Sequence, residues 1–105
     1  MSMRGLILSG LGLALAVTAA AASAATPAAE GKALASSQGC VMCHAAGGMA
    51  KPLSSYVGDS DDRLEEAILD PKKALGPATM MPPFQGKLSA AQLAALVAYI
   101  KAGGR

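Results

Sequence analysis

The clearest hydrophobic pattern lies near the C-terminal end of the chain. Apolar side chains recur every three or four residues between Leu93 and Ile100, which predicts one buried face of an α-helix. Ser89 and Gln92 have the spacing of a capping box, in which each residue's side chain accepts a hydrogen bond from the other's backbone N–H. The sequence therefore predicts a helix that begins at Ser89 and ends before Gly103.

Two further helices are predicted upstream. Thr26-Pro27 is a typical helix start, and that helix should run to about Ser37. Asp59 or Ser60 can cap a second helix, which should end before Pro71 because a residue that precedes proline avoids the α region.

The connecting segments, residues 45–58 and 72–86, are rich in glycine and proline and show no sustained period, so both are expected to be long loops. No alternation typical of strands is present. The predicted fold class is all-α, with three main helices and two long loops.

The first 25 residues have the layout of a secretory signal peptide. One cation, Arg4, precedes the apolar run 6–17, and Ala22-Ser23-Ala24 offers small residues at a cleavage site. The alternative is an uncleaved membrane anchor, because residues 6–25 are just long enough to span a bilayer. We expect cleavage, which leaves one domain, residues 26–105.

Charge and composition narrow the function. The 105-residue chain has a formal net charge of +2, and residues 26–105 contain eight cations and seven acids. Such a balance lacks the basic footprint of a nucleic-acid-binding protein, so no nucleic acid is expected as a partner. Only 3% of the residues are aromatic, and a domain this small often needs a disulfide, metal or cofactor for stability.

The motif Cys40-Val41-Met42-Cys43-His44 contains both cysteines and the only histidine. Cys-x-x-Cys-His is the attachment sequence of c-type haem: each thiol forms a thioether with one vinyl group, and the histidine binds the iron. A thioredoxin-like pair would need a βαβ pattern, a structural zinc site would need four ligands, and a disulfide here would close too small a loop to stabilise much. One covalently bound haem c per chain is therefore expected.

A methionine is the expected second iron ligand, because no other histidine exists. Met42 lies inside the motif, and Met49 follows His44 too closely to reach the opposite face. Met80 and Met81 lie in the far loop, beside a rigid Pro-Pro pair, and a thioether suits haem iron. The residues themselves leave the choice between these two open.

With these motifs the chain resembles the small bacterial class I c-type cytochromes over nearly its whole length after residue 25. The resemblance implies a cytochrome c fold, and it selects Met81, which directly precedes proline, as the ligand. It also implies that the carbonyl of Pro52 accepts the second N–H of His44. Tyr56 is the candidate partner of a haem propionate, because the tryptophan often found in that role is absent.

The resemblance also predicts that the first and last helices cross closely, with Gly31 against Tyr99. The family often places an aromatic residue four positions after that glycine, where this chain has Ala35.

The expected function is a soluble electron carrier, not an enzyme, exported to the periplasm. Its partners would be a redox protein donor and acceptor that bind transiently, and the mature chain would be a monomer without membrane contact. Two alternatives remain: a five-coordinate haem protein that acts on peroxide or a small gas, and a cytochrome subunit docked permanently on a larger redox enzyme. Lys72 and Lys73 could contribute to docking.

Overall fold

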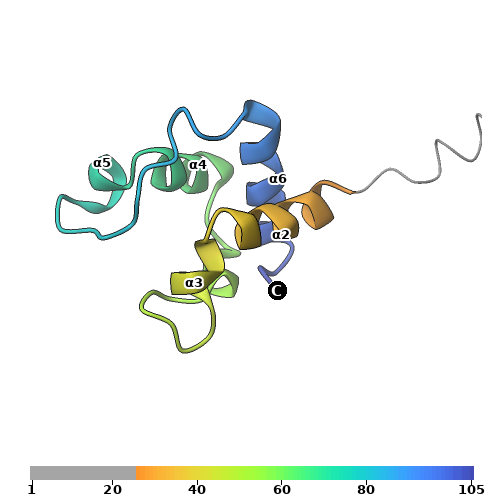
Figure 1. Ribbon diagram of the computed structural model, residues 1–105, viewed down its shortest axis with the longest axis horizontal. Coiled ribbons are helices and arrows are strands. Elements are labelled where there is room, and N and C mark those ends of the chain that lie inside the picture. Colours follow the sequence, from red (N-terminus) through yellow and green to blue (C-terminus); the bar gives the residue numbers. More distant parts are fainter. Residues whose placement is uncertain (1–25) are drawn as a thin grey trace, which may run out of the picture.

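The computed structural model describes residues 26–105 as helices joined by loops, with no strand among them (Figure 1). The expected signal peptide, residues 1–25, lies outside the described residues. Within the described part, no helix is both long and apolar enough to cross a membrane. The helices are α2 (Pro27–Ser37), α3 (Cys40–His44), the 3-10 helix η1 (Leu53–Tyr56), α4 (Asp61–Leu69), α5 (Pro71–Leu75) and α6 (Ala90–Lys101).

The three long helices begin where side chains cap their free N–H groups. Thr26 Oγ1 accepts from the N–H of Ala29 at 3.3 Å, and Ser60 Oγ accepts from the N–H of Arg63 at 3.2 Å. At α6 the capping box is complete, with bonds of 3.1 Å and 2.9 Å between Ser89 and Gln92. The three helices predicted from sequence are thus confirmed.

Two short helices were missed within the predicted loops. Pro71 ends α4 but also begins α5, because proline is well suited to the first helical position. Asp70 caps this helix by accepting from the N–H of Lys73 at 3.4 Å. The other predicted loop contains η1, which places Tyr56 at a fixed position.

The dominant contact in the fold is the crossing of α2 and α6 (Figure 1). A Cβ atom added to Gly31 would overlap the carbonyl oxygen of Ala95 and lie 2.6 Å from the Cβ of Tyr99. The two backbones can approach this closely only because glycine has no side chain. The predicted pairing of Gly31 with Tyr99 is confirmed, and Ala35, on the same helix, is fully buried.

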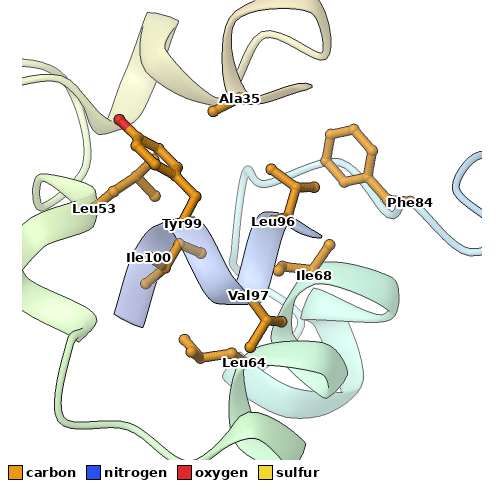
Figure 2. Packing of buried hydrophobic residues seen from close by; sticks show 9 residues of the cluster. All are labelled: Ala35, Leu53, Leu64, Ile68, Phe84, Leu96, Val97, Tyr99 and Ile100. Atoms are coloured by element: carbon orange, nitrogen blue, oxygen red, sulfur yellow. The ribbon is translucent and has the colours of Figure 1, made fainter. Parts of the chain in front are cut away.

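One hydrophobic core joins α6 to the rest of the domain. Figure 2 shows the side chains of α6 projecting between residues of α2, α4, η1 and the loop that precedes α6. On the surface, Lys101 Nζ binds Asp61 Oδ1 at 2.7 Å and links α6 to α4, although an exposed pair of this kind contributes only about 0–1 kcal/mol. The core cluster consists of Ala35, Leu53, Leu64, Ile68, Phe84, Leu96, Val97, Tyr99 and Ile100.

The helix crossing predicts a large effect of one methyl group. Gly31→Ala should lower the free energy of unfolding by about 1–3 kcal/mol, because the added Cβ forces the two backbones apart. This loss should occur even though alanine favours a helix by about 1 kcal/mol over glycine. Denaturant unfolding of the haem-loaded protein measures the change.

Gly58→Ala is the matched control, since a Cβ there meets nothing within 4 Å. It should change stability by less than about 1 kcal/mol. Equal unfolding free energies for the two variants would show that the close crossing does not constrain the fold.

Candidate functional site

The two cysteines and the histidine lie on a single short helix. Gly39 leads from α2 into α3 with a φ of 81°, a left-handed conformation that glycine adopts without strain. Within α3, Cys40 and Cys43 are three residues apart, so both sulfurs lie on the same side of the helix. Neither thiol is in a disulfide. The helix therefore presents two free thiols together, with the imidazole of His44 beside them.

The two thiols have different surroundings. Cys40 is half-buried against the core, whereas Cys43 is exposed. Burial raises the pKa of the Cys40 thiol, because a thiolate loses hydration there, and a backbone hydrogen bond partly opposes this effect. Cys40 is thus the thiol that is held against the apolar interior.

His44 is oriented by a backbone carbonyl on the loop that follows α3. Its Nδ1 donates to the carbonyl oxygen of Lys51 at 2.8 Å. Because a carbonyl only accepts, Nδ1 carries the proton, and Nε2 keeps the lone pair that can bind a metal. The same loop is tied back to α3, since the N–H of Ala50 donates to the carbonyl of Cys43 at 3.0 Å. The imidazole is therefore fixed in both tautomer and direction.

The predicted acceptor for His44 was wrong by one residue. The carbonyl of Pro52 is bound by Ser55 instead, through the backbone N–H at 3.0 Å and Oγ at 2.7 Å. Pro52 is the N-cap of η1, so its carbonyl takes part in the first turn of that helix. Proline still contributes indirectly, because it restricts the backbone of Lys51, whose carbonyl is the acceptor.

Tyr56 lies next to the histidine. Its ring meets the His44 ring edge-on, with the centroids 5.8 Å apart and the planes at 78°. Tyr56 is the last residue of the 3-10 helix η1, and the ring contact places it beside His44 at the end of α3. Tyr56 thus belongs to the site, and its hydrogen bond to a haem propionate stays a prediction.

The two adjacent methionines differ in their environment. Met80 is 81% exposed, whereas Met81 is half-buried and packs against the hydrophobic core. The loop that carries them is joined to the end of α4, where Phe84 N–H donates to the carbonyl of Ile68 at 3.1 Å. Of the two thioethers, that of Met81 is the one directed toward the interior.

These residues surround one cavity of about 400 Å³, which lies within the usual size range of cofactor pockets. Its lining residues come from α3 with its flanking residues, from η1, and from the end of α5 with the loop that follows it. Its walls combine two thiols and an imidazole with thioethers and apolar side chains, a donor set that suits haem iron. Within residues 26–105 no group of three or more His, Cys, Asp or Glu side chains could hold a bare metal ion. The site fits a c-type haem, which Cys40, Cys43, His44 and Met81 could hold.

Comparison with known proteins agrees with this geometry. Searches of curated proteins and of solved structures found no match to this chain. A family model described as cytochrome c oxidase, cbb3-type, subunit III matches residues 26–100, which include the complete attachment motif and both loops. This match confirms the resemblance to small c-type cytochromes, the all-α cytochrome c fold and the covalently bound haem c. The chain therefore belongs to the cytochrome c oxidase, cbb3-type, subunit III family of c-type cytochrome domains.

Proposed function

We propose that the mature chain is a periplasmic carrier of single electrons, with His44 and Met81 as the axial ligands of its haem. Family membership supports haem-based electron transfer as the general role. The finer assignment rests on one observation: His44 and Met81 come from different segments and line the same cavity, each half-buried.

Each ligand has a role that follows from its surroundings. The hydrogen bond from Nδ1 to Lys51 holds the His44 ring in place and increases the basicity of Nε2. The thioether of Met81 is a soft donor that favours the ferrous state, and so raises the reduction potential. When bound, the haem supplies the one-electron couple. If His44 and Met81 both bind the iron, no open position would remain for a substrate, which favours a carrier over an enzyme.

Export is supported by the sequence. Residues 1–25 have the layout of a signal peptide, and covalent haem attachment of this kind is associated with the periplasm in the family that the chain resembles. After cleavage the partners would be a redox protein donor and an acceptor, bound weakly and briefly through a small interface.

A second candidate function is a subunit docked permanently on a larger redox enzyme. The family match favours it, because that family is described by a subunit of an oxidase. The same haem chemistry serves both roles, so the two differ in the lifetime of the complex and not in the site.

Removal of the proposed ligand should alter the haem directly. Met81→Ala should abolish the red absorption band of sulfur-ligated ferric haem. It should also lower the reduction potential by on the order of 0.1 V or more, within the ~0.8 V range over which axial ligands act. Optical redox titration measures both effects.

Met80→Ala is the matched control, because it removes the same side chain at an exposed neighbouring position. It should leave the band intact and the potential nearly unchanged. If Met80→Ala loses the band while Met81→Ala keeps it, the ligand assignment is wrong. A high-spin ferric spectrum in the unmodified protein would instead favour a haem that binds peroxide or a gas.

The carrier and subunit roles can be separated with native protein. Size-exclusion chromatography of a gentle extract should place the haem-containing chain at the size of a monomer, and its mass should equal residues 26–105 plus one haem. Elution of all the chain with a larger haem protein would support the subunit role. Retention of residues 1–25 in the mass would show an anchored form.

A further inference from the structure

A second, smaller cavity adjoins the haem site. Its volume is about 130 Å³, and it shares His44, Tyr56, Leu75 and Met81 with the larger cavity. Since both proposed axial ligands line both cavities, the two spaces are neighbouring parts of one crevice.

The two ends of this crevice differ in chemistry. Cys40 and Cys43 line only the larger cavity, whereas Asp59 and Arg63 line only the smaller one. Among the described residues, Arg63 is the only lysine or arginine that lines either cavity. The crevice thus has a thiol end and an end with a guanidinium group.

The position of Arg63 is set by both its backbone and its side chain. Its N–H donates to Ser60 Oγ in the first turn of α4. Its guanidinium crosses to α5, where Nη1 donates to the carbonyl of Ala74 at 3.1 Å. A guanidinium group has five N–H donors, so several remain for another acceptor at the cavity. Planar donors of this kind match a carboxylate in a two-point hydrogen bond.

The covalent structure of haem has the same asymmetry as the crevice. Its two vinyl groups, which become the thioethers, lie on one side of the porphyrin, and its two propionates lie toward the opposite side. Thioethers at Cys40 and Cys43, which line only the larger cavity, would therefore place the carboxylates toward the smaller one. We propose that Arg63 binds a haem propionate there and, with its positive charge, stabilises the ferrous state; this inference rests on the haem site of the proposed function.

The surrounding charges make this contact important. Asp59 lines the same small cavity, and Asp61 and Asp62 lie in the first turn of α4. Asp61 is already paired with Lys101, and neither Asp61 nor Asp62 lines the cavity. Without Arg63, the only charged side chain lining this end among the described residues would be Asp59, whose like charge disfavours a propionate. Tyr56 lines the same space and offers a hydroxyl, but no charge, to the same group.

A purely structural role for Arg63 makes a different prediction. Its bond to Ala74 joins α4 to α5, and a glutamine side chain can also donate an N–H to that carbonyl. If the residue serves only that link, Arg63→Gln should leave the haem carboxylates unaffected.

The test compares Arg63→Gln, Arg63→Lys and Lys32→Gln in the haem-loaded protein. Resonance Raman spectroscopy detects the propionate bending band, which reports hydrogen bonding to the haem carboxylates, and a redox titration gives the potential. Arg63→Gln should shift the band and move the redox equilibrium toward the ferric form by about tenfold, as expected for one charge lost at a partly screened distance. Arg63→Lys should restore most of the redox equilibrium because it keeps the charge.

Lys32→Gln removes the same charge from the exposed surface of α2, where the residue lines neither cavity. It should leave the propionate band unshifted and change the redox equilibrium by less than about twofold. An unshifted band in Arg63→Gln, together with a redox change no larger than that of Lys32→Gln, would overturn the proposal. If the proposed function itself is wrong, the unmodified protein would already lack the spectrum of methionine ligation. If only the proposal for Arg63 is wrong, the unmodified protein would keep that spectrum.

Discussion

The close crossing of α2 and α6 is the constraint on which the rest of the domain depends. Gly31 lets the two backbones touch, and the side chains of α6 then reach the other segments through one small core. Because only Gln38 and the left-handed Gly39 separate α2 from α3, the position of the haem-binding motif is set by the same crossing. The helix crossing thus positions the helix that carries His44, and the loops then complete the site around it.

The site itself is built mostly from loops, and each is fixed by a few backbone hydrogen bonds. The carbonyl of Lys51 fixes the imidazole on one side, while the bond between Phe84 and Ile68 secures the Met81 loop on the other. Such loops have little core of their own, so ligand geometry depends on the helices to which they are joined. Covalent attachment of the haem fits this arrangement, because two thioethers retain a cofactor that a small domain encloses only partly.

Features determined by local chemistry could be predicted from the sequence. The caps of the three long helices lie within four residues of the groups they bind, and the haem motif is contiguous. The helix α5 was missed because Pro71 was interpreted only as a stop, although proline also begins helices. The acceptor for His44 was misplaced by one residue because sequence does not show which carbonyl of an extended segment faces the ring. Arg63 carried no local signal at all; only the packing of α4 against α5 brings it to the crevice.

The central claim is that haem iron lies between the nitrogen of His44 and the sulfur of Met81, so that electrons are exchanged without an open coordination position. Near-infrared magnetic circular dichroism of the ferric protein tests this claim most directly, because the energy of its charge-transfer band identifies the axial pair of a low-spin haem. The account predicts a low-spin spectrum at the energy of histidine–methionine ligation. A high-spin spectrum, or a low-spin band typical of another ligand pair, would contradict it.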